Sequence, residues 1–194
     1  IGSPNFTKGR NGQTIDRVVL HWIVGKLESA DATFQNTTRN TSSHYGIGDD
    51  EIHQYVKEEN TAHHAGTFAM NQRSIGIEHE GGPTLPISDQ TYQTSASLVR
   101  DICQRYGIPI DREHVIKHNE VRATQCPGTL DVDRIIKEAK VGVEVSLSDD
   151  ERRALAILKT FKESAEHGNL EGAINALVGA HRDLEAAKTG IKTL

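Results

Sequence analysis

The sequence lacks the features that mark membrane proteins and disulfide-rich proteins. Its 194 residues include only two cysteines, Cys103 and Cys126, so at most one disulfide can form and folding must rest on a hydrophobic core. Apolar residues occur in short runs such as residues 18–20, far from the roughly 18 apolar residues that a membrane-spanning helix needs. These absences exclude a transmembrane protein and a small scaffold held together by disulfides.

The chain also lacks an excess of basic residues over acidic residues. The chain carries 22 lysines and arginines against 27 aspartates and glutamates, which gives a formal net charge of −5. This balance provides no general attraction for a nucleic-acid backbone, so no nucleic-acid partner is expected.

The first residues, from Ile1 onward, lack the basic segment and apolar stretch of a secretory signal. We therefore expect no secretory leader in this sequence.

Histidine, in contrast, is abundant. The chain has ten histidines, and eight of them precede residue 140. Imidazole groups bind metal ions and titrate close to neutral pH. Their concentration in this part of the chain indicates metal or proton chemistry there.

Apolar patterns predict a central strand and a hairpin. Residues 15–24 form a nearly continuous apolar run rich in β-branched residues, typical of a strand that is covered on both faces and ends near His21. Residues 43–48 and 51–56 alternate on either side of a turn, which predicts a hairpin. A short strand is predicted at residues 115–118.

A further strand is predicted at residues 74–82, where apolar and polar residues alternate and the run closes on glycines. Successive side chains of a strand point to opposite faces. Ile75 and Ile77 therefore share one face, while Glu78 and Glu80 share the other with Gly76.

Helical spacing is clearest over residues 88–106, where Ser88 provides an N-cap and Gly107 a stop. A second amphipathic helix is predicted over residues 132–140, and Ser29 is predicted to cap a short helix earlier in the chain. Strands and helices mix without strict alternation. We therefore predict an α/β fold with a mixed central β-sheet flanked by helices.

A change of composition after residue 140 predicts the domain boundary. From there the chain is dominated by Glu, Ala, Leu and Lys with helical spacing, and Gly168-Asn169 separates two helical runs. We predict a main domain over residues 1–140, a linker at 141–148, and a C-terminal helical hairpin within 149–194. About fifty residues in two helices bury little surface by themselves.

Three side chains have the spacing of a possible metal site. His21 ends the first predicted strand, and His118 and Cys126 are separated by a loop short enough to bring both onto one ion. Zinc prefers nitrogen and sulfur donors, and hydrolytic sites use three protein ligands. Spacing alone leaves other interpretations open, because His21 can be a buried core histidine and Cys126 a small buried residue, as Cys103 is expected to be.

Five ordered motifs resemble those of the zinc-dependent N-acetylmuramoyl-L-alanine amidases, a family that includes phage endolysins, bacterial autolysins and peptidoglycan recognition proteins. The motifs are Val18-Val19-Leu20-His21-Trp22, Ser42-Ser43-His44-Tyr45, Ala62-His63-His64-Ala65-Gly66, Ser74-Ile75-Gly76-Ile77-Glu78-His79-Glu80-Gly81, and His118-Asn119-Glu120-Val121 with Thr124-Gln125-Cys126-Pro127-Gly128. The resemblance covers about residues 1–140. It implies the catalytic domain of a phage endolysin or a bacterial autolysin.

The resemblance implies Zn²⁺ held by His21, His118 and Cys126. It also implies that Glu78 moves the proton of a zinc-activated water, with Glu80 as the rival for that role. Some members carry a catalytic tyrosine where this chain has Ser43, and this departure strengthens the case for Glu78.

Further residues follow from the same resemblance. Some members have lysine at the position of Thr124, whose hydroxyl can donate a hydrogen bond to an oxyanion but cannot supply a charge. His64 is expected to contact substrate in the cleft. Asn71 and Arg73 are expected to bind muropeptide carboxylates, since arginine offers a bidentate fork, although a plain surface role stays open for both.

The implied function is hydrolysis of the amide between N-acetylmuramic acid and L-alanine of the stem peptide in bacterial cell-wall peptidoglycan. Two alternatives stay open: a non-catalytic peptidoglycan-binding module, and an amidase that acts on soluble muropeptides. Recognition proteins that lose the cysteine ligand bind without cutting, so the presence of Cys126 favours catalysis. An endolysin would be made in the host cytoplasm and act on the cell wall. Residues 149–194 would then be a linker, a wall-binding segment or an oligomerisation segment. The oligomeric state stays open.

Overall fold

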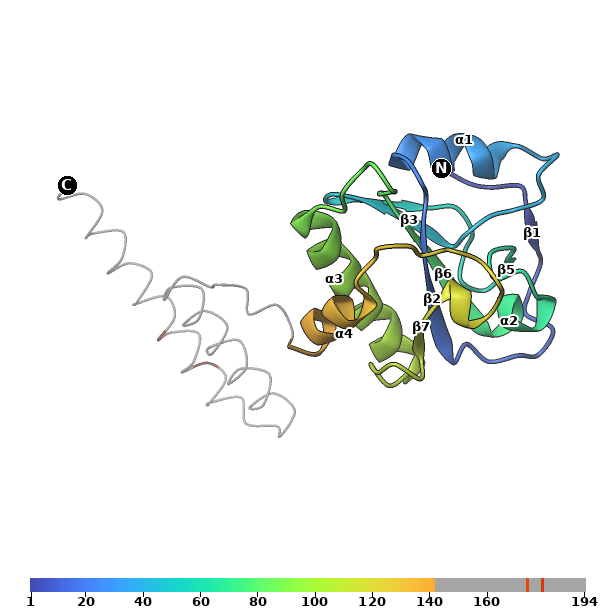
Figure 1. Cartoon of the computed structure of the whole chain (residues 1–194). Coiled ribbons are helices and arrows are strands. Elements are labelled where there is room, and N and C mark those ends of the chain that lie inside the picture. Colours follow the sequence, from blue (N-terminus) through green and yellow to red (C-terminus); the bar gives the residue numbers. More distant parts are fainter. Residues whose placement is uncertain (142–173, 175–178, 180–194) are drawn as a thin grey trace. The chain divides into compact units, whose positions relative to one another are not determined.

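A computed structural model describes residues 1–141, 174 and 179 of the chain (Figure 1). Its centre is a five-stranded sheet in the order β4-β3-β6-β2-β7. The strands are β2 (Arg17–Trp22), β3 (Tyr45–Gly48), β4 (Glu51–Gln54), β6 (Ser74–His79) and β7 (Val115–Lys117). All neighbours pair in parallel except β3 and β4, which form the predicted antiparallel hairpin. The expected mixed α/β sheet is confirmed.

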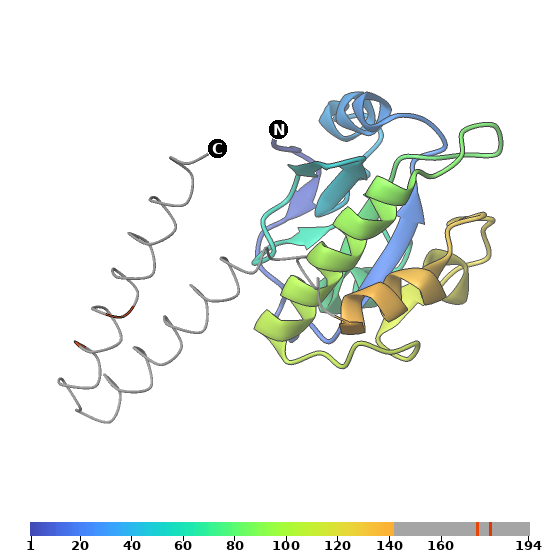
Figure 2. The same ribbon diagram turned by 90° about the vertical axis from the view of Figure 1, so that its left-hand side faces the viewer.

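Two helices cover one face of this sheet. Helices α3 (Asp89–Tyr106) and α4 (Val132–Val141) lie side by side across the strands (Figure 2). They bury the apolar face of the central strands, as alternation along β6 predicts. The main members of this core are Val18, Leu20, Ile75, Ile77, Val99, Ile102, Cys103 and Ile135.

The opposite face of the sheet is covered by α1 (Leu27–Gln35), α2 (Phe68–Arg73) and the two-stranded ribbon of β1 (Phe6–Thr7) and β5 (Thr61–Ala62). A smaller apolar cluster around Phe34, Tyr55 and Ala62 lies here. Gly46 is required for this packing, because a Cβ at that position would lie 2.7 Å from Tyr55 Oη.

The boundaries of the helices agree with the local signals in all but one case. Ser88 Oγ accepts from Thr91 N at 3.0 Å to cap α3, and Gly107 ends the helix in the left-handed conformation with φ 65°. The prediction that Ser29 caps a helix is wrong, because α1 begins at Leu27 and Ser29 lies within it. The Leu27 N–H instead donates to the Glu80 carboxylate at 3.1 Å, so a distant acidic group stabilises this helix start.

The predicted C-terminal hairpin of residues 149–194 and most of the predicted linker at 141–148 lie outside the described residues, which end their continuous run at Val141. Among the helices that the structure does describe, none is long and apolar enough to cross a membrane.

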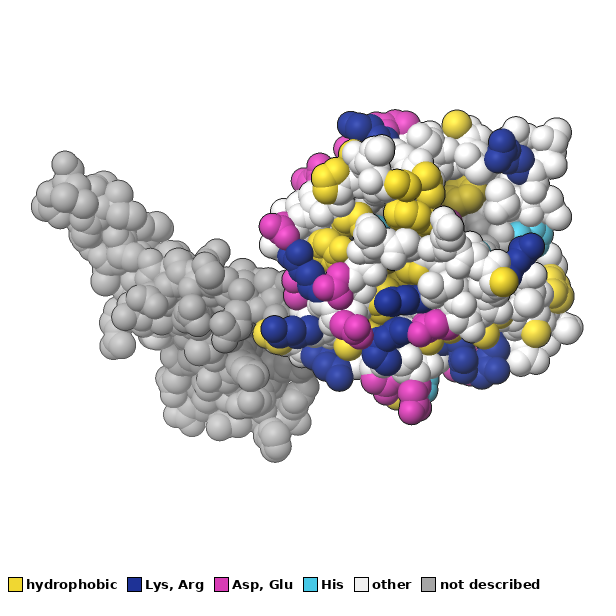
Figure 3. Space-filling model, in the orientation of Figure 1, with side chains coloured by type: hydrophobic (Ala, Val, Ile, Leu, Met, Phe, Trp, Pro, Cys, Tyr) yellow, Lys and Arg dark blue, Asp and Glu magenta, His cyan; other side chains and the backbone are white. Residues whose placement is uncertain are grey.

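On the face shown in Figure 3, basic and acidic side chains intermix. Arg134 forms surface ion pairs with Asp89 and Glu138.

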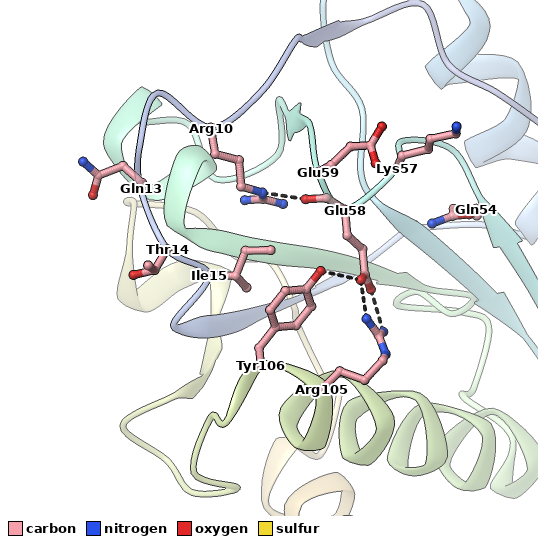
Figure 4. Close-up of a pocket in the computed structure, with 10 residues that line it drawn as sticks. All are labelled: Arg10, Gln13, Thr14, Ile15, Gln54, Lys57, Glu58, Glu59, Arg105 and Tyr106. Carbon is pink, nitrogen blue, oxygen red and sulfur yellow. Dashed lines mark hydrogen bonds and ion pairs between the residues drawn. The ribbon is translucent and has the colours of Figure 1, made fainter.

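Arg10 ties the N-terminal segment to the sheet (Figure 4). The residue is 8% exposed, and its guanidinium donates to the carbonyl oxygens of Glu58 (2.6 Å), Gln72 (2.9 Å) and Ser74 (3.0 Å). These carbonyls come from the end of α2, the start of β6 and the loop after β4. One side chain thus satisfies backbone carbonyls of three different elements.

We predict that Arg10→Ala lowers the free energy of unfolding by more than about 3 kcal/mol, because it leaves several buried carbonyls without a donor. Urea denaturation monitored by circular dichroism measures this change. Arg39→Ala, at an exposed position, is the matched control and should stay within about 0.5 kcal/mol of the unchanged chain. Equal stability of the two variants would contradict the role given to Arg10.

Two buried histidines make the fold sensitive to acid. Burial lowers the pKa of His44 to about 3, helped by the charge of Arg10, and burial lowers the pKa of His79 to about 4. His79 Nδ1 donates to the His21 carbonyl at 2.7 Å, and its Nε2 accepts from Ser95 of α3 at 2.7 Å. Both rings are therefore neutral in the folded chain at neutral pH.

These pKa values set the direction of the pH dependence. An unfolded histidine has a pKa near 6.5. Between pH 6.5 and 4, residue 79 is therefore protonated in the unfolded chain but neutral in the folded chain. The free energy of unfolding falls as the pH falls through this range. We predict that His79→Gln reduces this loss by about 1.4 kcal/mol per pH unit between pH 6 and 4.5. Urea denaturation at a series of pH values tests it. An unchanged slope in the variant would refute the assignment, and above pH 7.5 no difference in slope is expected.

Candidate metal centre and its surroundings

His21, His118 and Cys126 meet in space at the carboxyl ends of the parallel strands. Their candidate ligand atoms all lie within 4.8 Å of one another. His21 Nδ1 lies 3.7 Å from Cys126 Sγ, and the rings of His21 and His118 have centroids 4.4 Å apart. Residues separated by about a hundred positions in the sequence thus form one cluster.

Each of the three comes from a different element. His21 lies near the end of β2, and His118 follows the end of β7 and opens a short 3₁₀ helix (His118–Glu120). Cys126 lies in the loop before α4, which turns at Gly128 with φ 59°. The turn packs on Trp22, since a Cβ at Gly128 would lie 2.2 Å from that ring. Contact with the end of β2 therefore holds the cysteine loop beside His21.

The three side chains fit a metal ion by their chemistry and by their unsatisfied atoms. His118 Nε2 is buried and has no hydrogen-bond partner within the described residues. A buried nitrogen without a partner costs free energy unless an ion or another group binds it. Two imidazole nitrogens and one thiolate are the donors of a borderline-soft divalent ion with one position left for water.

The electrostatics of the ligands keep the histidines neutral and the thiol protonated in the absence of an ion. Burial lowers the pKa of His21 well below its usual value, and neighbouring histidines lower it further. Burial, with the charge of Arg122, also lowers the pKa of His118. Burial raises the pKa of Cys126 to about 12, helped by the negative charge of Glu78. Metal binding must therefore release the thiol proton.

Glu78 lies on β6 directly opposite His21 of β2 in the strand register. Its side chain is partly exposed, but its Oε2 is buried and has no hydrogen-bond partner within the described residues. Burial raises the pKa of Glu78 to about 8. The site therefore combines three candidate ligands with a carboxyl group that can exchange a proton near neutral pH.

The other predicted carboxylate, Glu80, is already engaged. It lies on the same face as Glu78, as predicted: Gly46 pairs with Glu78, and a Cβ at Gly48, on the same face of β3, would lie 2.8 Å from Glu80 Oε2. That oxygen accepts from the Leu27 N–H of α1. Thr124 lies in the exposed cysteine loop, where its Oγ1 accepts from the Cys126 N–H at 3.2 Å and its own hydroxyl proton stays available.

The three residues expected to contact substrate lie in different surroundings. His64 is 7% exposed, and its ring nitrogens contact His21 at 3.0 Å and Ser74 at 3.3 Å. Asn71 is buried, and its side-chain oxygen accepts from the Ala65 N–H at 2.7 Å. Arg73 is partly exposed and forms an ion pair with Asp16. Their contacts with substrate stay predictions.

Sequence patterns missed two residues that position this cluster. Ser74 contacts the His64 ring, and Gly76 leaves room for it, because a Cβ at Gly76 would lie 2.5 Å from His64 Cγ. A glycine in the interior of a strand is a known signal for the close approach of another group. That signal was present at Gly76, whereas nothing near Ser74 in the sequence pointed to His64.

A separate groove of about 780 Å³ lies at the other end of the domain, near the start of β2 and the end of α3 (Figure 4). Glu58 is the centre of its polar contacts, accepting from Tyr106 Oη at 2.8 Å and pairing with Arg105. The groove shares no lining residue with the metal cluster. Its lining residues are Arg10, Gln13, Thr14, Ile15, Gln54, Lys57, Glu58, Glu59, Arg105 and Tyr106.

Comparisons with known sequences agree with this site. A family model described as N-acetylmuramoyl-L-alanine amidase matches residues 11–129. N-acetylmuramoyl-L-alanine amidase A of Achromobacter lyticus is 34% identical over 110 residues, covering 55% of this chain and 60% of that protein. A probable N-acetylmuramoyl-L-alanine amidase of Bacillus licheniformis is 27% identical over 127 residues, covering 57% and 35%. The chain thus spans 60% or less of the length of these curated relatives.

Solved structures share the fold. A crystal structure of AmpD superposes with a TM-score of 0.61 at 26% identity, covering 71% of this chain and 92% of that one. The N-acetylmuramoyl-L-alanine amidase LysC of Clostridium intestinale superposes with a TM-score of 0.57 at 24% identity, covering 74% and 94%.

We predict that Cys126→Ser greatly weakens the binding of a divalent metal, because the thiolate is one of only three protein ligands. Cys103→Ser is the matched control, since Cys103 is buried in the hydrophobic core and its substitution should change stability alone. Metal content after mild dialysis, measured by mass spectrometry, compares the two. Equal loss of metal from both folded variants would count against this ligand set.

Proposed function

Because this chain belongs to the N-acetylmuramoyl-L-alanine amidase family, we propose that it hydrolyses the amide bond between N-acetylmuramic acid and L-alanine of the stem peptide in bacterial peptidoglycan. One observation carries the proposal: two histidines and a cysteine come within 4.8 Å of one another next to a carboxylate that is buried at Oε2. A binding module needs neither feature, whereas hydrolysis of an amide needs both an activated water and a proton carrier.

The metal is Zn²⁺, held by His21, His118 and Cys126. Zinc suits a set of two imidazoles and one thiolate better than Mg²⁺ or Ca²⁺, which prefer oxygen ligands. Bound zinc supplies Lewis acidity, which activates water and polarises the scissile carbonyl. The protein keeps both imidazoles neutral by burial, so that they can act as ligands without first losing a proton.

Glu78 accepts the proton of the attacking water and passes it to the departing amine of L-alanine. Its Oε2 has no competing hydrogen-bond donor within the described residues, and its pKa of about 8 lets it exchange a proton near neutral pH. A bound cation favours the carboxylate, which lowers this pKa and prepares the group to act as a base. Glu80 is less suited to the role, because it accepts a hydrogen bond from the start of α1.

Thr124 assists at the reacting carbonyl. Its side chain is exposed in the loop that carries Cys126, and its hydroxyl proton is free to donate to the negative oxygen that develops during attack. Arg73, Asn71 and His64 are the residues proposed from the sequence to recognise the muropeptide, but His64 and Asn71 are buried and already bonded to groups inside the domain. Of these, Arg73 is the most accessible, and its guanidinium can bind a substrate carboxylate if it exchanges its partner Asp16. Both residues lie at the amino ends of β6 and β2, the opposite edge of the sheet from the metal ligands, so such a contact is with a part of the muropeptide remote from the scissile amide.

The place of action is the bacterial cell wall, and an endolysin of a phage or an autolysin of a bacterium fits the proposal. The rival, a module that binds peptidoglycan without cutting it, requires neither Glu78 nor the three ligands. The second rival, cleavage of soluble muropeptides, uses the same chemistry on a smaller substrate. Mass analysis of the products released from purified walls and from soluble fragments separates the three.

We predict that Glu78→Gln lowers turnover on peptidoglycan by roughly 10²–10⁴-fold, the range expected for loss of general acid–base catalysis. The amide keeps the size of the carboxylate but cannot accept the proton. Because Glu78 is not one of the three proposed zinc ligands, the zinc content should not change. Turnover is measured as the release of new L-alanine amino termini, with zinc analysed in the same samples.

Glu80→Gln is the matched control, because its amide oxygen can still accept from the Leu27 N–H, and its turnover should fall far less. If this variant is inactive with zinc retained while Glu78→Gln stays active, the base has been assigned to the wrong carboxylate. If both stay active, neither carboxylate is the proton carrier.

A further inference from the structure

A line of buried hydrogen bonds runs from the metal cluster back into the domain. His21 Nε2 lies 3.0 Å from His64 Nδ1, and His64 Nε2 lies 3.3 Å from Ser74 Oγ. Ser74 Oγ in turn lies 2.6 Å from the backbone oxygen of Met70. His21, His64 and Ser74 are all buried, so water does not compete for these contacts.

The end of the line sets the direction of every bond in it. A carbonyl oxygen can only accept, so the single Ser74 hydroxyl proton is donated to Met70 at the shorter distance of 2.6 Å. Ser74 Oγ must then accept from His64 Nε2–H. A neutral imidazole carries one proton, so His64 Nδ1 is an acceptor.

The same logic reaches the metal ligand. Because His64 Nδ1 accepts, the proton between the two rings belongs to His21 Nε2. The remaining nitrogen of neutral His21, Nδ1, therefore carries a lone pair. This is the nitrogen that faces Cys126 Sγ at 3.7 Å.

We propose that His64 is a positioning residue for the metal: through Ser74 and Met70, it holds His21 in the one tautomer and ring orientation that present Nδ1 to the ion. The inference rests on the metal site of the proposed function and gives His64 a role in that site. Metal-bound histidines commonly donate their second nitrogen to an oriented acceptor, and loss of such an acceptor weakens metal binding. Here the acceptor is a second histidine.

The fold holds the His64 ring in this place from two sides. Gly76 of β6 lies beneath it, where a Cβ would come within 2.6 Å of His64 Nδ1. Asn71 Oδ1 accepts from the backbone N–H groups of His64 and Ala65 at 3.2 and 2.7 Å. The glycine allows the ring to approach His21, and the asparagine fixes the backbone from which it projects. Asn71 is thus a support of this arrangement.

The arrangement also leaves His64 with little capacity for another partner. Both ring nitrogens are engaged, and the residue is 7% exposed. A substrate contact through either nitrogen would have to break the bond to His21 or the bond to Ser74. The neighbouring His63 is only partly buried, and within the part of the chain that the structure describes its ring bonds to Thr7 and Asn40 and to none of the metal ligands.

Nuclear magnetic resonance of the metal-free full chain tests the direction of the bonds without any variant. In protein labelled with ¹⁵N-histidine, long-range proton–nitrogen spectra at neutral pH identify the protonated nitrogen of each ring. We expect the proton on Nε2 in both His21 and His64. A proton on Nδ1 of His21 would overturn the inference.

Zinc affinity, measured by competition with a chromogenic chelator, tests the consequence. His64→Phe keeps a ring but removes the acceptor, and its zinc dissociation constant should rise by about 10–100-fold. His64→Asn places an amide oxygen near the position of Nδ1 and should bind zinc more tightly than His64→Phe. His63→Phe is the matched control and should bind zinc as the unchanged chain does. Thermal melts of the metal-free variants verify that each one folds.

The outcomes separate this inference from the proposed function. Unchanged zinc affinity in folded His64→Phe refutes the positioning role and leaves the amidase proposal intact. Failure of the unchanged chain to bind zinc refutes the metal site of the proposed function, while the spectra still decide the tautomers. If His64→Phe does not fold, the spectra of the unchanged chain and the affinity of His64→Asn decide the question.

Discussion

The parallel pairing of β2 with β6 and β7 is the constraint on which the rest of the site depends. Paired residues of parallel strands point to the same side of the sheet, so the register His21↔Glu78 brings the first ligand and the carboxylate together. The register Leu20↔Lys117 places His118 one step past the last pair, at the same edge. The carboxyl ends of parallel strands are where α/β folds form their sites, because the crossover connections leave this edge open.

This arrangement makes the domain bury polar side chains that a purely structural core would avoid. His21, His44 and His79 are almost fully buried, yet each has a defined partner, and each is kept neutral by its surroundings. The same burial that suits the imidazoles for metal binding makes the fold less stable in acid, since the unfolded chain takes up the protons. Burial of imidazoles therefore keeps His21 neutral at the metal site and, at His44 and His79, makes the fold sensitive to acid.

Glu78 of β6 and Glu80, just past the end of this strand, show how position on one face leads to different chemistry. Glu78 lies at the metal cluster with a buried oxygen that has no partner within the described residues, whereas Glu80 lies two residues further on and stabilises the start of α1. Alternation along a strand cannot distinguish them, because both point to the same side. The difference comes from what packs against each one, namely α1 in one case and the metal ligands in the other.

The sequence by itself determined the local and periodic features of this protein. Residues 74–79 and 89–106 form a strand and a helix because their apolar spacing, Ser88 and Gly107 are local signals, and the ordered motifs indicate His21, His118, Cys126 and Glu78 as site residues. Only the tertiary structure decided which groups meet across the chain. It placed Glu80 at the start of α1, which sequence reasoning had assigned to Ser29, and it set His64 between His21 and Ser74. Hydrogen bonds between residues many positions apart depend on strand register and helix packing, and no local pattern in the sequence records them.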